Sequence, residues 1–381
     1  MTNQLPFPAR SGGQVREAQL ITALGSRAEI TLAVITDQFD RDLAYISSAL
    51  AHCVEVAIFE SAPDADKDTP SRVGMYRNSA FGAYLASAAT KVDLVNIEGY
   101  FLVRHLPSQI GVPIVLVAEN VEYDIERQRE TLHPVICSNP SLVLKHESAA
   151  WNRARVVAAL TPFDVAAIRA LSPETEVVLS PNGFDHVRAR GPRTRHRSGC
   201  AVTFLGNYRW EPTRRGAERL INSIWPRIHA LAPEATLALV GAGMSPEFEK
   251  RAKQTAGVNV VGEVHSVGPY LDKTDVFLCP IDMGSGIMMK LVEALHAGCP
   301  VVTSPQALRG LPPAAARAVI TAESDDEIAA SVRLLVDDSC LRDRLSAAAF
   351  SACSELPTWT QAGEVMLRLW QRIGCDGEEQ T

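Results

Sequence analysis

Short runs of β-branched and apolar residues alternate with longer helical patterns along most of the chain. In the first half these runs lack a period of two, which is typical of strands buried on both faces of a parallel sheet. The pattern predicts helices such as 14–24 and 164–171 between strands at residues 30–36, 54–59, 93–97, 114–118, 156–160 and 177–180. This order predicts right-handed βαβ units and an open, doubly wound sheet.

A polar break separates this series from a second one. Residues 188–199 are rich in arginine and contain Gly191 and Pro192, which indicates an interdomain linker, with a patch for phosphates or membrane headgroups as the alternative. Strands are then predicted at residues 202–205, 236–240, 258–261, 276–279, 301–303 and 318–321. Helices are predicted at residues 215–231, 246–256, 288–297, 325–335, 341–350 and 358–373.

The predicted fold class is therefore α/β, with two Rossmann-like, doubly wound parallel-sheet domains. Residues 1–187 form the first domain, 188–199 the linker and 200–357 the second domain. The closing segment, 358–381, is a helix that needs a surface for its apolar face, and we expect it to cross back to the first domain. Two such domains facing a central cleft predict ligand binding between them, at the carboxyl ends of strands.

Composition excludes several classes of protein. A chain of 381 residues exceeds one ordinary core, and its 46% hydrophobic and 21% charged residues exclude disorder, coiled coil and collagen. A net charge of −7 argues against a general nucleic-acid binder. The sequence shows no long apolar run, no signal-peptide pattern and no CxxC pair. We therefore expect a cytoplasmic protein with no nucleic-acid partner and no integral membrane segment.

The strongest candidate site is a glycine-rich turn that follows a predicted strand. The backbone amides of Gly284, Ser285 and Gly286 lie at the start of a helix, where unpaired N–H groups and the helix dipole favour an anion. Lys290 and Glu293 share one face of that helix. The cation suits a diphosphate and the carboxylate suits the two hydroxyls of a ribose. A simple surface ion pair on a glycine-capped helix is the alternative.

The segment from Gly284 to Val302 resembles the donor-site segment of the GT-B glycosyltransferases, more narrowly of the family 4-type bacterial enzymes with the motif G-x-G…K…E-A…G-x-P-V-V. Other similar segments follow in the matching order and cover nearly the whole chain. They are residues 6–16 (P-x-P…GG-x-x-R), 118–122 (the H-N-x-E element), 180–185 (P-N-G-V-D), 204–212 and 233–241.

The resemblance implies transfer of a sugar from a nucleotide-diphosphate sugar to an acceptor hydroxyl, with retention of anomeric configuration and without a metal ion. Such a reaction needs electrostatic stabilisation of the diphosphate leaving group. No cofactor is implied, and UDP is the first guess for the nucleotide. The implied donor-binding residues are Gly12, Gly13, Gly206, Gly284, Ser285, Gly286, Ile287, Met288, Lys290 and Glu293.

Three residues are expected to be catalytic by this resemblance: Lys290, Arg209 and Glu119. Arg209 is the expected second cation for the diphosphate, and Arg214 and Arg215 are its rivals. Glu119 stands where many relatives have histidine. Its carboxylate suits three roles: accepting a hydrogen bond from a donor or acceptor hydroxyl, acting as an acceptor-side base, or anchoring an amino group of the acceptor. A structural hydrogen bond to the N-terminus of a neighbouring helix is the alternative.

The acceptor is expected to be a sugar or a small natural product. Arg16, Arg77 and Asn120 are the expected acceptor-binding residues. Ser285 departs from the family, because many relatives carry a glutamate there that holds the transferred sugar. No metal site is expected, since the D-x-D letters at residues 64–66 lie in an acidic loop and no two histidines are four residues apart.

Two other functions remain open from the sequence. The first is a GT-B-fold sugar-nucleotide epimerase, which needs acid and base groups around the sugar. The second is a non-catalytic nucleotide-sugar binding module, which Ser285 keeps open. Donor binding without turnover would distinguish the module from an enzyme.

Overall fold

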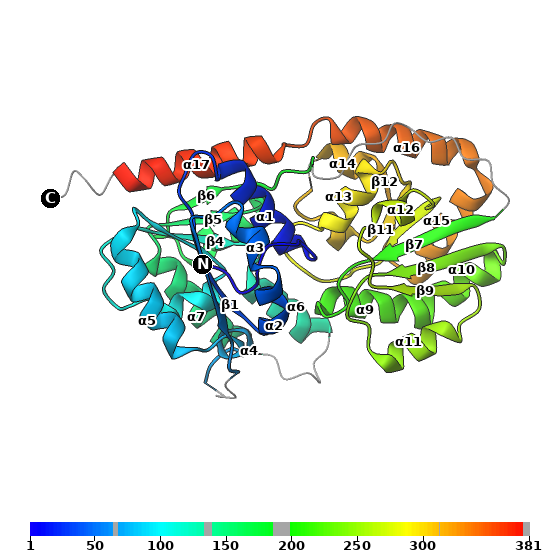
Figure 1. Cartoon of the computed structure of the whole chain (residues 1–381). Helices are drawn as coiled ribbons and strands as arrows, with labels where there is room; N and C mark the ends of the chain where they lie inside the picture. Colours follow the sequence, from blue (N-terminus) through cyan, green and yellow to red (C-terminus); the bar gives the residue numbers. More distant parts are fainter. Residues whose placement is uncertain (64–67, 133–138, 186–198, 312, 376–381) are drawn as a thin grey trace. The chain divides into compact units, whose positions relative to one another are not determined.

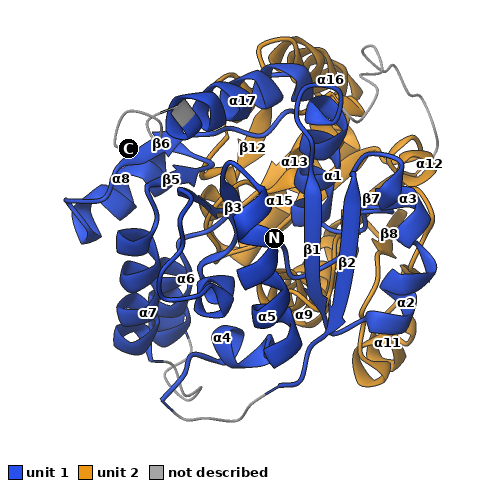
Figure 2. Ribbon diagram, turned by 60° about the vertical axis from the view of Figure 1, so that its left-hand side comes forward, with its two compact units in different colours: residues 1–183, 357–381 blue, residues 184–356 orange. Residues whose placement is uncertain are grey.

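A computed structural model describes the chain except for residues 64–67, 133–138, 186–198, 312 and 376–381 (Figure 1). The chain divides into two compact units, which Figure 2 colours separately. Unit 1 comprises Met1–Gly183 and Pro357–Thr381, and unit 2 comprises Phe184–Leu356. Of the predicted linker, 188–199, all but Gly199 lies outside the described residues.

Unit 1 holds six parallel strands in two sheets, ordered β1-β2 and β3-β4-β5-β6. The strands are β1 (Thr31–Thr36), β2 (Glu55–Glu60), β3 (Val95–Glu98), β4 (Ile114–Ala118), β5 (Val156–Ala159) and β6 (Val177–Leu179). The helices are α1 (Gly12–Leu24), α2 (Phe39–Ala44), α3 (Ile46–Leu50), α4 (Ser71–Met75), α5 (Ser79–Ala88), η1 (Ala89–Lys91), η2 (Tyr100–His105), α6 (Glu122–Leu132), α7 (Pro140–Arg153), α8 (Pro162–Leu171) and α17 (Trp359–Cys375).

Unit 2 holds one parallel sheet of six strands, ordered β12-β11-β10-β7-β8-β9. The strands are β7 (Cys200–Leu205), β8 (Ala235–Val240), β9 (Val258–Gly262), β10 (Val276–Cys279), β11 (Val301–Thr303) and β12 (Val319–Thr321). The helices are α9 (Glu211–Arg219), η3 (Leu220–Ile224), α10 (Trp225–Leu231), α11 (Pro246–Lys253), α12 (Gly268–Leu271), α13 (Met289–His296), η4 (Pro305–Leu308), α14 (Pro313–Arg317), α15 (Asp325–Asp337) and α16 (Ser339–Cys353).

The sequence predicted the strands best where they form continuous, buried apolar runs. The predicted strands at Ile114–Ala118, Val276–Cys279 and Val301–Thr303 match the structure residue for residue. The prediction of one open sheet in the first half is wrong in one respect. Unit 1 has two separate sheets, because only Met1 and Thr2 lie between β1 and β3.

The predicted helix over residues 215–231 also differs from the structure. It begins earlier, at Glu211, and contains a π-helical segment, Leu220–Ile224, before it continues from Trp225 to Leu231. Pro226 lies two residues after the end of this segment and has no N–H group for an ordinary helical hydrogen bond. A π segment beside the proline is one way for the helix to continue without that bond.

Helix α17 packs into unit 1. Met366, Leu367, Leu369 and Ile373 form one buried cluster with Leu24 of α1 and with Val115 and Val117 of β4. Within the described part of the chain, no helix is both long and apolar enough to cross a membrane.

Candidate functional site

Lys290 lies in the first turn of α13, directly after the glycine-rich turn. Its side chain is buried, with only 8% of the residue exposed. The ammonium Nζ donates a hydrogen bond to Thr213 Oγ1 at 2.7 Å. It also lies 5.5 Å from the centre of the Phe204 ring and 5.8 Å from that of Trp210. The cation therefore sits among a hydroxyl and two aromatic rings.

Burial lowers the pKa of Lys290 to about 8, and the nearby Cys279 and Glu293 partly oppose this shift. The group is thus mostly charged at neutral pH. Its hydrogen-bond partner Thr213 is an uncharged hydroxyl. A buried cation gains most from an anionic partner, so this position suits a phosphate oxygen.

Gly206 lies directly against this ammonium group. A Cβ at this position would collide with Lys290 Nζ and would lie 2.9 Å from Thr213 Cγ2. Only glycine leaves room for the lysine side chain here. The structure thus brings together two residues, Gly206 and Lys290, that are far apart in the sequence.

The glycine-rich turn reaches the same region. Gly286 has a φ of 70°, in the left-handed region that favours glycine. A Cβ at Gly284 would lie 2.9 Å from Met288 Cε and 3.6 Å from the Trp210 ring. Trp210 therefore contacts both the turn and the Lys290 ammonium group.

The remaining predicted donor residues surround this turn. Ser285 and Met288 are buried, whereas Ile287 and Glu293 are half-buried. The alternative from the sequence was a surface ion pair between Lys290 and Glu293. The structure does not show such a pair, because the Lys290 ammonium group is buried and donates its hydrogen bond to Thr213.

The three candidate arginines have different surroundings. Arg209 is exposed, and Arg214 lies 3.5 Å from Glu218 on the surface of α9. The Arg215 side chain is only 14% exposed and lies 3.9 Å from Asp282 Oδ1, in the loop that leads to the glycine-rich turn. Its Nε has no hydrogen-bond partner among the residues that the structure describes. Arg215 is therefore the one of these three arginines whose side chain is shielded from solvent.

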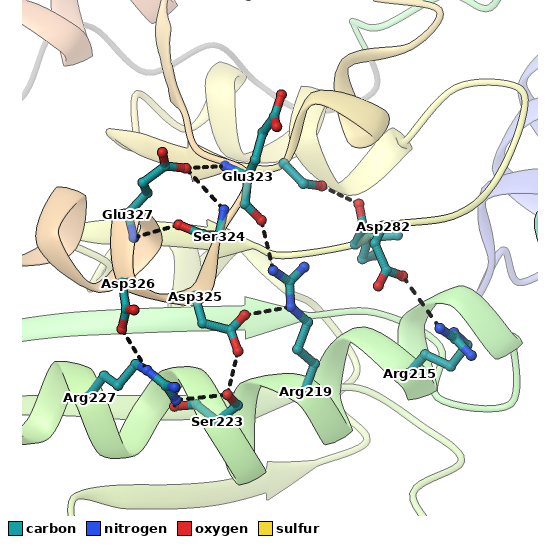
Figure 3. A network of polar contacts seen from close by, with 12 residues as sticks. Arg215, Arg219, Ser223, Arg227, Asp282, Glu323, Ser324, Asp325, Asp326 and Glu327 are labelled. Atoms are coloured by element: carbon teal, nitrogen blue, oxygen red, sulfur yellow. Dashed lines mark hydrogen bonds and ion pairs between the residues drawn. The ribbon is translucent and has the colours of Figure 1, made fainter. Parts of the chain in front are cut away.

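A network of ion pairs holds the helix that carries Arg215 (Figure 3). Arg219 Nε lies 2.7 Å from Asp325, and Arg227 Nε lies 2.7 Å from Asp326. Ser223 adds a hydrogen bond to Asp325. Because both acids are in the first turn of α15, these contacts join α15 to α9 and α10.

In unit 1, the glycine pair lies at the start of α1. Ser11 caps this helix by accepting a hydrogen bond from Gln14 N. Gly12 is exposed, and a Cβ at Gly13 would lie 3.0 Å from both carboxylate oxygens of Glu119. Because Gly13 has no side chain, the carboxylate of Glu119 can lie close to the first turn of α1.

Burial, followed by the charge of Glu98, raises the pKa of Glu119 to about 7, and Arg16 and Arg72 oppose the shift. A carboxyl group with this pKa exchanges its proton near neutral pH. Glu119 also lines a cavity of about 20 Å³ together with Asn120 and Glu98, a volume that suits one water molecule.

Arg16, a predicted acceptor contact, lies in α1. It is 1% exposed, and its guanidinium donates to Asn182 Oδ1 at 2.6 Å and to Ser180 Oγ at 3.2 Å. It thereby ties the segment after β6 to α1, which is a structural task. Arg77 is exposed, and its backbone carbonyl accepts a hydrogen bond from Ala62 N at 2.8 Å.

Sequence reasoning missed three residues of the site: Thr213, Trp210 and Phe204. Trp210 and Phe204 stand in segments that were singled out for their resemblance, but nothing in their spacing indicates contact with Lys290. The described residues contain no group of histidines, cysteines and acids able to hold a metal ion. The D-x-D letters at 64–66 lie outside the described residues.

Part of the chain is similar to a known family. Residues 199–338 match the family described as "Glycosyl transferases group 1". This part of the chain is thus similar to the group 1 glycosyltransferases. The matched segment contains Lys290 with its partner Thr213, the glycine-rich turn and Arg215.

Solved structures similar over almost the whole chain establish the GT-B fold. WaaG, a glycosyltransferase involved in lipopolysaccharide biosynthesis, is 16% identical with a TM-score of 0.66, and the match covers 98% of this chain and 97% of WaaG. HepE from Anabaena, in complex with UDP and glucose, is 13% identical with a TM-score of 0.70, covering 97% and 98%. Sucrose-phosphate synthase from Thermosynechococcus elongatus is 16% identical with a TM-score of 0.71, covering 98% of each chain.

Curated relatives match a shorter part of the chain. A phosphatidyl-myo-inositol mannosyltransferase of Mycolicibacterium smegmatis is 26% identical over 48% of this chain and 47% of its own length. One of Mycobacterium tuberculosis is 30% identical over 34% of this chain and 35% of its own length. The chain thus matches about half, or less, of the length of these relatives.

Proposed function

We propose that this protein is a glycosyltransferase that moves a sugar from a nucleotide-diphosphate sugar to an acceptor hydroxyl, with retention at the anomeric carbon and without a metal ion. The observation that carries the proposal is the buried Lys290 ammonium group within the segment that is similar to the group 1 glycosyltransferases. A buried cation beside a glycine-rich turn suits a diphosphate leaving group.

Residues of unit 2 supply the donor chemistry in this proposal. Lys290 and the amides of residues 284–288 bind the diphosphate and stabilise the charge that develops as the glycosidic bond breaks. Arg215 is the second cation, favoured over Arg209 and Arg214 because it is shielded from solvent and its Nε has no partner in the described part of the chain. Glu293 binds the hydroxyls of the ribose.

Unit 1 supplies the acceptor side. Glu119, with a pKa that burial raises to about 7, accepts a hydrogen bond from an acceptor hydroxyl, and Asn120 lies next to it. Arg77 remains a predicted acceptor contact. Gly12 and Gly13 offer the amides at the start of α1 to the donor phosphates.

UDP is the proposed nucleotide, and HepE in complex with UDP and glucose supports this choice. The proposed acceptor is a sugar or a small natural product, and the proposed location is the cytoplasm. A mannosyl donor and a lipid-linked acceptor are the competing substrates, because the curated relatives are named as phosphatidyl-myo-inositol mannosyltransferases.

The test is nucleotide binding followed by transfer. Isothermal titration with UDP, GDP, ADP and dTDP, each with and without EDTA, is expected to show tight binding of UDP that EDTA does not change. Lys290→Ala is expected to lower turnover about 100-fold or more, because it removes a charge that stabilises the leaving group. Lys253→Ala is the matched control, since Lys253 is an exposed lysine of the same unit paired with Glu249.

Four outcomes would contradict parts of the proposal. Binding of none of the nucleotides would remove the donor site. Binding without transfer to any acceptor in a sugar and natural-product panel would favour the binding module. Interconversion of the UDP-sugar without an acceptor would favour the epimerase, and an inverted anomeric proton in the product NMR spectrum would contradict retention.

A further inference from the structure

Polar side chains that follow β11 bond to the loop that follows β10. The two strands are parallel neighbours, and Cys279 pairs with Thr303 at the end of their ladder. Thr303 Oγ1 donates a hydrogen bond to Cys279 O at 3.0 Å. Ser304 Oγ donates one to Ile281 O. Because Thr303 and Ser304 are buried, their hydroxyls take the place of water as partners of the loop carbonyls.

Gln306 adds a third bond of this kind, to the glycine-rich turn itself. Its Nε2 donates a hydrogen bond to Gly284 O at 2.8 Å. Gln306 is half-buried in η4, directly after Pro305. The three side chains thus donate to carbonyls that lie successively farther along the loop, and the bond from Gln306 is the one that reaches the turn.

The bond from Gln306 fixes the direction of the next amide group. The peptide bond between Gly284 and Ser285 is trans. In a planar trans peptide the C=O and N–H groups point in opposite directions. Because the Gly284 carbonyl points to Gln306, the Ser285 N–H group points away from Gln306.

The backbone at Gly284 is open to rotation. A glycine populates φ and ψ values that other residues avoid, and Gly284 has a φ of 135°. No side chain at this position restricts the orientation of the peptide that follows. Rotation of this peptide by half a turn would exchange the directions of its N–H and C=O groups. The turn would then present an oxygen, which repels an anion, where it now presents an N–H group.

We propose that Gln306 is a positioning residue for the donor diphosphate. It holds the Gly284 carbonyl so that the amides of the glycine-rich turn, and not its carbonyl oxygens, face the phosphates. This role rests on the proposed function, in which the amides of residues 284–288 bind the diphosphate. Gln306 acts through the turn rather than by contact with the donor.

The carboxamide group of glutamine suits this task, because it donates N–H bonds and carries no charge. An ionised carboxylate of the same length accepts hydrogen bonds only. In Gln306→Glu it would face the Gly284 carbonyl oxygen with a second negative oxygen. A protonated carboxyl group donates one O–H bond. In this variant the orientation of the turn therefore becomes dependent on pH.

The test compares Gln306→Met, which keeps the length of the side chain but cannot donate, with Gln306→Glu. Gln306→Met is expected to weaken the Kd for UDP-glucose about tenfold at both pH 5 and pH 7, because one amide–phosphate bond is lost. Gln306→Glu is expected to bind about tenfold more weakly than wild type at pH 7, and within about threefold of wild type at pH 5. Gln254→Met, at an exposed position after α11, is the matched control and is expected to bind as wild type does.

Wild type is measured at both pH values as the reference. UDP-glucose carries the same charge at pH 5 and pH 7. The ratio to wild type therefore corrects for the other charged and titratable groups of the loop, of α13, of α9 and of the segment after β11. These groups are Asp282, Lys290, Glu293, His296, Arg215 and Arg309.

A crystal structure of Gln306→Met without nucleotide tests the orientation directly. The peptide between Gly284 and Ser285 is expected to be rotated, or to occupy two orientations, relative to wild type. An unrotated peptide, equal Kd values for Gln306→Met and wild type, or equal losses for Gln306→Glu at both pH values would overturn this role. If wild type binds no UDP-glucose, the proposed UDP donor is contradicted, whereas the crystal structure still decides whether Gln306 orients the turn.

Discussion

At the scale of single residues, the environment of Lys290 distinguishes it from an ordinary helical lysine. The side chain is buried against Phe204, Trp210 and Thr213, and the ammonium group is hydrogen-bonded to a hydroxyl. Such burial disfavours the charged form until an anion arrives. The residue therefore couples its own protonation to the proposed binding of a diphosphate.

This coupling predicts the pH dependence of nucleotide binding. Because burial lowers the pKa of Lys290 to about 8, the ammonium form is lost as pH rises through 8. The Kd for UDP is expected to be about tenfold weaker at pH 9 than at pH 7, measured by isothermal titration. Because the unfolded chain keeps this proton to higher pH, the buried charge of Lys290 lowers folding stability at pH 7, and this loss is relieved as pH rises above about 8.

Lys290→Ala is the control for that measurement. The variant is expected to bind UDP weakly at both pH values, with no tenfold change between them. A pH dependence that survives in Lys290→Ala would assign the titration to another group.

The neighbouring arginines give a second prediction at this scale. Arg215→Ala is expected to lower turnover about 100-fold, because a shielded cation beside the glycine-rich turn stabilises the leaving group. Arg214→Ala is the matched control, since its exposed pairing with Glu218 is worth little. Steady-state kinetics on both variants make the comparison. Equal losses, or a larger loss for Arg214→Ala, would remove Arg215 from the site.

At the scale of elements, α15 positions the helix that carries Arg215. Its first turn supplies Asp325 and Asp326 to the arginines of α9 and α10 (Figure 3). This turn is fixed by a capping box, in which Ser324 accepts from Glu327 N and Glu327 accepts from Ser324 N. The cap thus stabilises the acids that hold α9.

Ser324→Ala is expected to lower the free energy of unfolding of unit 2 by about 1 kcal/mol, because one helical N–H loses its partner. Urea unfolding followed by circular dichroism measures the change. Ser351→Ala, at an exposed position inside α16, is the control and is expected to leave stability unchanged. An equally large loss of unfolding free energy in Ser351→Ala would show that the Ser324 cap makes no specific contribution to stability.

At the scale of the whole molecule, the chain returns to its first unit at the end. Residues 357–381 belong to unit 1, although unit 2 separates them from the rest of it in the sequence. Gly363 of α17 lies close to α1, where a Cβ would come within 3.1 Å of Ala23 Cβ. Unit 1 is therefore complete only when the last helix has been made.

Met366→Ala tests this dependence. Met366 is fully buried in the cluster with Leu24 and Val115, so its truncation is expected to destabilise unit 1 by about 2–5 kcal/mol. Arg368→Ala, an exposed substitution on the same helix, is expected to stay within about 0.5 kcal/mol. Thermal unfolding compares the two. A Met366→Ala protein as stable as the control would show that α17 is dispensable to unit 1.

The sequence by itself determined the strands that are buried on both faces of a sheet, such as β4 and β10. Both faces of such a strand are covered by other elements, so nearly all of its residues are apolar and form a continuous run. It also determined the glycine-rich turn and the order of the motifs along the chain. These features are local, or repeat at fixed spacing, so one chain segment is enough to reveal them.

Only the tertiary structure decided which residues meet. Lys290 contacts Gly206 and Thr213 from distant parts of the chain, and Arg16 bonds to Asn182 inside unit 1 rather than facing solvent. The split of the first sheet was equally hidden, since apolar runs do not show which strands pair with one another. Such contacts depend on packing between segments that hydrophobic periodicity does not relate, and periodicity describes one segment at a time.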